Sequence, residues 1–234
     1  MAENEKNGDS KERLILPPFP LPRLSELIGQ DDIRKRLTAA VKAAQSGTAR
    51  VPHILFDGPP GLGKRTFARS LALELEGGWN TISGAELKKI IDVIPYLTNA
   101  TKDSVLFVDG IDRIPSAAAA EYLASAMRDF TAPITFGEGE KERLINVPLR
   151  KFTLVGTAAE PGRVNPLLLD QFGIRGHFDF YTPEELSVII RRAAAHLKIA
   201  IDDAAVLEIA RRSGGRSCQA FDLICTVWEK KNDE

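Results

Sequence analysis

Short apolar runs alternate with stretches of helical periodicity along most of the chain. Apolar side chains recur at helical spacing over 31–44, which predicts a helix. Continuous apolar runs at 53–57, 104–109 and 152–156 are typical of strands buried on both faces of a sheet. A shorter alternating run at 177–180 predicts a further strand. Strands that alternate with helices indicate an α/β fold with a parallel sheet between two layers of helices.

The end of the chain carries helical patterns alone, because no strand pattern follows Tyr181. We therefore predict an α/β domain over 21–182 and a small all-helical domain over 183–234. Residues 1–20 are first polar and then rich in proline, which predicts a disordered or extended tail. Besides the helix that follows the turn near residue 60, helices are expected at 116–129, 183–197, 202–212 and 217–230.

Composition and charge are those of an ordinary globular protein. Of the 234 residues, 44% are hydrophobic and 27% are charged, with 31 Lys and Arg against 32 Asp and Glu. This balance disfavours a protein that coats nucleic acid through a basic surface. No apolar run has the roughly 20 residues of a membrane helix and no signal peptide opens the chain, so we expect a cytoplasmic protein without membrane contacts. Cys218 and Cys225 form neither a disulfide framework nor a paired metal motif.

A glycine-rich turn after the strand at 53–57 carries the clearest chemical signal. Backbone N–H groups of such a turn converge on phosphate oxygens, and Lys64 is placed to reach the terminal phosphates. The motif requires Ser or Thr after the lysine to bind Mg²⁺, but Arg65 stands there and Thr66 comes one residue late, about 100° around the helix. A glycine turn without a ligand is the alternative interpretation. The candidate nucleotide-binding residues of this turn are Gly58, Pro59, Pro60, Gly61, Leu62, Gly63, Lys64, Arg65 and Thr66.

Several motifs outside the turn belong together. They are Ile28-Gly29-Gln30, Val105–Asp109, Ala126–Phe130, Phe152–Gly156, Phe172–Ile174, Phe180–Thr182 and Ile209–Ser213. With the turn, they make residues 27–228 resemble the RuvB-type AAA+ ATPases, which drive Holliday-junction branch migration in bacterial recombination. The resemblance implies an AAA+ P-loop domain, a three-layer sandwich around a parallel sheet, and a helical lid domain after it. It also implies ATP or ADP as cofactor, with Ile28 and Tyr181 near the adenine.

The chain departs from this family where ATP hydrolysis requires polar groups. The family has an acidic residue after its Walker B aspartate to polarise the attacking water, but here Gly110 follows Asp109. Asp109 stays a candidate Mg²⁺ ligand. Loss of a positioned base typically costs about 10²–10⁴ in rate. The family's polar sensor falls on Ala159, which has no group that could bond the γ-phosphate.

The arginines of the family are replaced as well. Leu169 and Gln171 stand where the family offers arginines to the ATP of a neighbouring subunit. Such an arginine is worth about 10³–10⁵ in turnover. The sensor arginine of the lid aligns with Cys218, or with Arg216 if the alignment shifts by two residues. The degenerate catalytic positions are therefore Arg65, Gly110, Ala159, Leu169, Gln171 and Cys218.

Residues 133–148 match the β-hairpin through which RuvB contacts its partner RuvA. The expected tip is charged, as an ordinary solvated hairpin would be, so docking and solvation both stay open. The chain ends at Glu234, soon after the expected lid, and we expect the winged-helix DNA-binding domain of the family to be missing. DNA would then be contacted only through a complex. The charged tip residues are Glu138, Glu140, Lys141, Glu142 and Arg143.

These observations predict a RuvB-like pseudo-ATPase that binds an adenine nucleotide but hydrolyses it poorly or not at all. It would be an assembly or regulatory partner of another protein or AAA+ subunit, in DNA recombination or repair. Its dependence on Mg²⁺ stays open. Two alternatives remain: a functional ATP-dependent branch-migration motor, or the core fragment of one, and a protein-interaction module that binds no nucleotide.

Overall fold

A parallel sheet of five strands, in the order β2-β3-β6-β1-β7, lies at the centre of the structure. The structure is a computed structural model that describes residues 19–136 and 143–232. The α/β class predicted from the alternating pattern is confirmed. The five strands are β1 (His53–Asp57), β2 (Trp79–Ser83), β3 (Val105–Asp109), β6 (Thr153–Ala158) and β7 (Phe172–His177).

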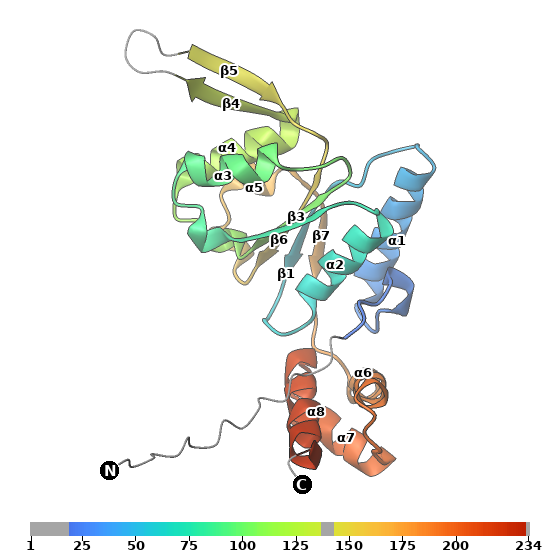
Figure 1. Cartoon of the computed structure of the whole chain (residues 1–234). Coiled ribbons are helices and arrows are strands. Elements are labelled where there is room, and N and C mark those ends of the chain that lie inside the picture. Colours follow the sequence, from blue (N-terminus) through green and yellow to red (C-terminus); the bar gives the residue numbers. More distant parts are fainter. Residues whose placement is uncertain (1–18, 137–142, 233–234) are drawn as a thin grey trace, which may run out of the picture.

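Helices cover both faces of the sheet (Figure 1). Helices α1 (Asp31–Gln45) and α2 (Lys64–Glu74) cover one face, and α3 (Ile90–Thr98), α4 (Ala117–Asp129) and α5 (Pro166–Leu169) cover the other. Because successive strand residues point to opposite faces, the sheet separates two apolar cores. Short 3₁₀ helices lie at Leu24–Glu26, Gly84–Glu86, Ile111–Arg113 and Pro161–Arg163.

Aromatic side chains fill the core under α2. Phe56 and Phe67 both contact Phe178 edge-on, with ring centroids 5.0 and 5.1 Å apart. At the β2 edge of the sheet, Trp79 stacks on Phe107 at 5.4 Å. Through Phe178, the first two contacts join α2 to β1 directly behind the glycine-rich turn.

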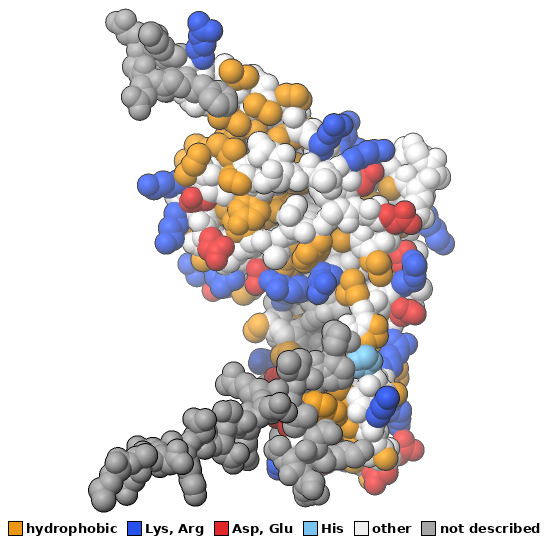
Figure 2. Space-filling model, in the orientation of Figure 1, with side chains coloured by type: hydrophobic (Ala, Val, Ile, Leu, Met, Phe, Trp, Pro, Cys, Tyr) orange, Lys and Arg blue, Asp and Glu red, His pale blue; other side chains and the backbone are white. Residues whose placement is uncertain are grey.

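A β-hairpin projects from the α/β part (Figure 1). Its strands β4 (Thr131–Phe136) and β5 (Arg143–Pro148) are antiparallel, so the hairpin predicted over 133–148 is present. Leu144 and Ile145 are exposed on it, and Figure 2 shows hydrophobic side chains at this end of the molecule. Four of the predicted tip residues, Glu138, Glu140, Lys141 and Glu142, lie outside the described residues.

Three helices form the C-terminal part, which we call the lid: α6 (Pro183–His196), α7 (Asp203–Arg212) and α8 (Ser217–Asn232). Their predicted ranges agree with the structure to within two residues at each end. A reciprocal capping box begins α6, since Thr182 Oγ1 accepts from the Glu185 N–H and the Glu185 carboxylate accepts from the Thr182 N–H. None of the described helices is long and apolar enough to cross a membrane.

An N-terminal strap, residues 19–22, joins the lid to the α/β part. The Phe19 ring lies 4.5 Å from the ring of His196 on α6 and 4.3 Å from that of Phe221 on α8. The Pro22 carbonyl accepts a hydrogen bond from Ser70 Oγ on α2, at 2.7 Å. The strap is therefore held from both sides.

Two predictions of secondary structure need correction. The strand expected at 177–180 is wrong, because β7 covers Phe172–His177 and the chain leaves the sheet after it. Strand β2 and helix α3 were not predicted. Only Ile82 is fully buried in β2, so its apolar pattern is weak, and α3 contains Pro95, which is unusual inside a helix.

Candidate functional site

The phosphate loop, residues 58–66, connects β1 to α2 at the carboxyl edge of the sheet. Three of its residues, Gly58, Gly61 and Gly63, have φ angles of 113°, 82° and 87°. A Cβ at Gly61 would lie 2.3 Å from Cys218 Sγ, so the lid packs directly on the loop. At this position a side chain would both strain the backbone, because φ is positive, and overlap Cys218.

Lys64 folds back over the loop. Its Nζ donates to the carbonyls of Gly58 and Pro59, each at 2.6 Å. Burial lowers the pKa of the Lys64 ammonium, and nearby negative charge opposes that shift. The charge comes from three carboxylates, Asp109, Asp57 and Asp112. The predicted phosphate-binding lysine therefore stands among acidic groups.

The lid and Tyr181, which stands two residues before α6, contact two carbonyls of the loop. The Cys218 N–H and Ser217 Oγ donate to the Gly61 carbonyl at 3.1 and 3.0 Å. The Tyr181 hydroxyl donates to the Leu62 carbonyl at 3.0 Å. Burial raises the pKa of Tyr181 to about 12, so the hydroxyl keeps its proton at neutral pH. The loop and the lid are thus joined by hydrogen bonds.

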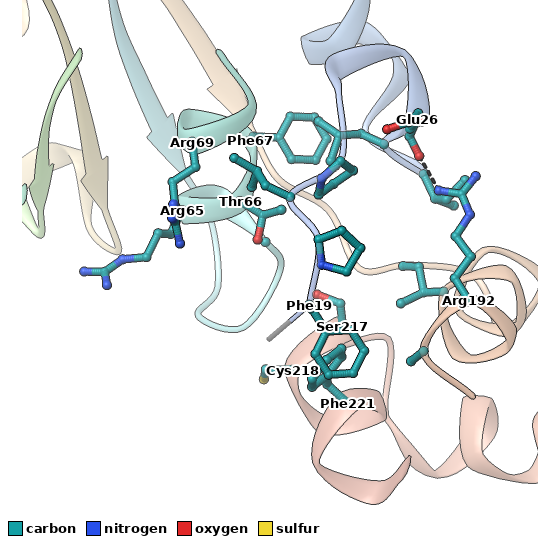
Figure 3. Close-up of a pocket in the computed structure, with 18 of the residues that line it drawn as sticks. Phe19, Glu26, Arg65, Thr66, Phe67, Arg69, Arg192, Ser217, Cys218 and Phe221 are labelled. Carbon is teal, nitrogen blue, oxygen red and sulfur yellow. Dashed lines mark hydrogen bonds between the residues drawn. The ribbon is translucent and has the colours of Figure 1, made fainter. Parts of the chain in front are cut away.

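A cavity of about 970 Å³ lies between the loop, the strap and the lid (Figure 3). Ile28 and Tyr181, which the resemblance puts near adenine, both line it, and so does Thr66. Its volume is at the upper end of the roughly 300–1,000 Å³ typical of small-molecule sites. The remaining wall includes the apolar side chains of Phe19, Leu21, Leu27, Ile189 and Phe221. A flat apolar base and a phosphate chain fit such a cavity.

Arg65 and Thr66 differ in direction. Both residues line the cavity, but the Arg65 guanidinium extends away from it and lies 5.3 Å from the centre of the Phe107 ring (Figure 3). Among the described residues, no group of three or more His, Cys, Asp or Glu side chains is arranged to hold a metal ion. Asp109, the one predicted candidate for a Mg²⁺ ligand, is thus not part of such a group.

Arg113 and Thr157 lie beside Asp109 and Gly110. Gly110 has a φ of 74°, and a Cβ there would lie 2.2 Å from Arg113 Nε. The same guanidinium donates through Nη2 to the Asp109 carbonyl at 3.2 Å. Thr157 on β6 donates to Asp109 Oδ1 and accepts from the Gly110 N–H, both at 2.8 Å. Thr157 was not predicted, because only the pairing of β3 with β6 brings it to Asp109. Arg113 was not predicted either, although it lies only four residues after Asp109, in the 3₁₀ helix Ile111–Arg113.

Three other degenerate positions, Ala159, Leu169 and Gln171, have uncharged side chains. Ala159 is exposed, and its backbone N–H donates to Asp112 Oδ2 at 3.1 Å. The Gln171 amide donates to the Leu167 carbonyl at 3.0 Å, and Leu169 packs against the core under α3 and α4. In the lid, the Arg216 guanidinium lies 5.9 Å from the Phe180 ring centre, while Cys218 faces the loop.

One pair of residues at the loop was missed. Asp57 ends β1 directly before Gly58, and its Oδ2 lies 2.5 Å from Nδ1 of His177, the last residue of β7. The sequence placed His177 only at the start of a predicted strand. An acidic residue that closes an apolar strand immediately before a phosphate loop was the available signal.

Comparisons with known proteins identify the family. Residues 20–178 match the model of the Holliday junction DNA helicase RuvB P-loop domain, and residues 181–224 match that of the RuvB AAA lid domain. The chain belongs to the RuvB family. Two similar relatives are each named Holliday junction branch migration complex subunit RuvB.

The relative from Rhodopirellula baltica is 44% identical over 191 residues, which are 82% of this chain and 52% of the relative. The relative from Rickettsia africae is 39% identical over 220 residues, 94% of this chain and 63% of the relative. The chain thus matches between about half and two thirds of the length of these RuvB proteins.

Solved RuvB structures have the same fold. The Thermotoga maritima RuvB Holliday junction branch migration motor matches with a TM-score of 0.76 and 38% identity, over 88% of this chain and 63% of that chain. A point mutant of the same protein gives a TM-score of 0.78 at 38% identity, over 88% of this chain and 64% of that chain. Both the resemblance to RuvB and the predicted AAA+ fold are confirmed.

Proposed function

We propose that this RuvB-family chain binds an adenine nucleotide between the phosphate loop, the strap and the lid, and hydrolyses it poorly or not at all. Residues 21–182 would hold the phosphates and residues 183–234 would close over them. The residue after Asp109 carries the proposal. Gly110 has no carboxylate to polarise the attacking water, and its φ of 74° strains any side chain placed there.

Nucleotide binding is supported by what the site keeps. The loop has its glycines, Lys64 lies at its centre, and the cavity has an apolar wall beside it. The substitutions at Ala159, Leu169 and Gln171 remove groups that act on the reacting phosphate rather than on the base. Loss of such groups lowers turnover without abolishing binding.

A subunit of this kind would act through assembly. Leu169 and Gln171 offer no cation to the nucleotide of a neighbour, so the chain would contribute contacts rather than catalysis. The β4–β5 hairpin, with Leu144 and Ile145 exposed, is a candidate protein contact. The two relatives are named as branch migration complex subunits, which favours a regulatory role in DNA recombination or repair.

Calorimetric titration with ATP and with ADP tests the binding. We expect both nucleotides to bind, and Lys64→Ala to weaken them by at least about tenfold. Lys42→Ala, an exposed substitution on α1, is the matched control and should change nothing. Because Arg65 replaces the metal-binding hydroxyl of the motif, we expect only a weak dependence on Mg²⁺. No binding heat with either nucleotide would favour the nucleotide-free module.

Turnover at high protein concentration tests the hydrolysis. We expect a rate far below about 1 s⁻¹, the lower end of ordinary enzymes. A rate near that value, lost in Lys64→Ala, would overturn the proposal and favour a functional motor. The motor would also be favoured if a mixture with an intact RuvB protein hydrolysed ATP faster than the sum of the two separate rates.

A further inference from the structure

Asp57 and His177 meet at the base of the phosphate loop. They end the neighbouring parallel strands β1 and β7 and are paired in the register of the sheet. The 2.5 Å contact between Asp57 Oδ2 and His177 Nδ1 is therefore fixed by strand pairing rather than by flexible side chains. Gly58, the first residue of the loop, follows Asp57 directly.

Negative charge dominates the surroundings of this pair. Asp179 Oδ1 lies 3.6 Å from His177 Nε2, and Lys64 is the cation that acts on both Asp57 and His177. Asp109 and Asp112 also act on Lys64. A polyphosphate at the loop would thus lie near one lysine and several carboxylates. Of these carboxylates, one in low-dielectric surroundings repels the polyphosphate most strongly.

The two partners differ in their access to water. The Asp57 side chain is 20% exposed, whereas that of His177 is 58% exposed. Solvent therefore screens Asp57 much less than Asp179, whose side chain is 84% exposed, and His177 exchanges protons freely with solvent. The hydrogen bond to Asp57 raises the pKa of His177 above 6.5, its ordinary value, against the opposing effects of burial and Lys64.

We infer that the Asp57–His177 pair makes phosphate binding at the loop depend on a proton held by His177. The imidazolium neutralises Asp57, so a polyphosphate meets only the remaining charges. The neutral imidazole leaves the Asp57 carboxylate uncompensated beside the phosphates. Affinity is then highest at low pH and falls as pH rises through the pKa of His177. This inference rests on the proposed nucleotide binding, for which Asp57 and His177 set the affinity.

Titrations with ATP from about pH 6 to about pH 8.5 test the inference. One unit charge near the phosphates is worth roughly three- to fivefold in affinity under solvent screening. Across this pH range the affinity of the wild type for ATP should fall by about that factor more than the affinity of the double variant Asp57→Asn/His177→Gln. The double variant lacks the pair and therefore reports the titration of ATP itself. Asp57→Asn should bind ATP tightly, and its affinity should not show the additional fall with rising pH. His177→Gln should bind ATP weakly at every pH.

Asp179→Asn is the matched control, because its side chain is 84% exposed and screened by water. It should keep most of the wild-type slope. The pKa of His177, followed by NMR, should fall in Asp57→Asn, which tests the pair without any nucleotide. Equal slopes in the wild type and Asp57→Asn, with ATP bound in both, overturn the inference alone. Absence of binding in every variant overturns the proposed function instead.

Discussion

Gly110 shows how a single residue removes a chemical option. Its left-handed backbone, with a φ of 74°, disfavours any side chain at the position that follows Asp109. The Arg113 guanidinium lies where a Cβ of residue 110 would point and donates to the Asp109 carbonyl, but it ends an exposed, flexible side chain that can move aside. The backbone conformation therefore carries the restriction at this position.

Gly110→Glu is therefore expected to leave ATP turnover unchanged. It should also lower the free energy of unfolding by about 1–3 kcal/mol, since a side chain at this φ is strained and displaces Arg113. Urea unfolding and an ATPase assay on the same variant measure both effects. Gly162→Ala, with open space around its Cβ, is the control and should cost under about 0.5 kcal/mol. Restored turnover in Gly110→Glu would contradict this account.

The sequence identifies the residues of the site that belong to a continuous motif, such as Lys64 and Asp109. It does not identify Asp57, His177 or Thr157, whose contacts come from the register of neighbouring strands. A pattern along one strand carries no information about which residue of another strand lies opposite.

At the scale of elements, the start of α6 fixes the lid relative to the loop. Tyr181 bonds to the Leu62 carbonyl, and the capping box of Thr182 and Glu185 begins the helix one residue later. The Thr-Pro pair and the helical spacing after it made α6 easy to predict. Strand β2 was not predicted, because its polar residues are as compatible with a loop as with a strand at the edge of a sheet.

Thr182→Ala should remove the N-cap of α6 and lower the free energy of unfolding by about 1 kcal/mol. Thr226→Ala, which removes a hydroxyl bonded to the Asp222 carbonyl inside α8, is the matched control and should cost less than half as much. Urea unfolding of the two variants makes the comparison. Equal costs would show that the capping box adds nothing beyond an ordinary helix hydroxyl.

At the scale of the whole molecule, the strap and the lid depend on each other. Phe19 contacts two lid helices, and Arg192 on α6 donates to the Glu26 carbonyl in the segment that follows the strap (Figure 3). The sequence predicted an extended segment and three lid helices, but not their contact. That contact depends on single aromatic side chains, which helical or proline patterns do not encode.

Phe19→Ala should loosen the lid. We expect faster amide hydrogen exchange in α6 and α8 and a free energy of unfolding lower by about 1–2 kcal/mol, since two aromatic contacts are lost. Phe19→Leu, which keeps apolar volume, should have a smaller effect. Unchanged exchange in both helices of the alanine variant would show that the strap does not hold the lid.

The stacking of Trp79 on Phe107 has a practical consequence. The chain has two tryptophans, Trp79 on β2 and Trp228 on α8, so the sheet edge and the lid each hold one natural fluorophore. Arg69 of α2, the helix that starts in the phosphate loop, lies 6.0 Å from the Trp79 ring centre. Tryptophan emission, recorded in single Trp→Phe variants, can therefore follow the loop helix and the lid as separate optical signals.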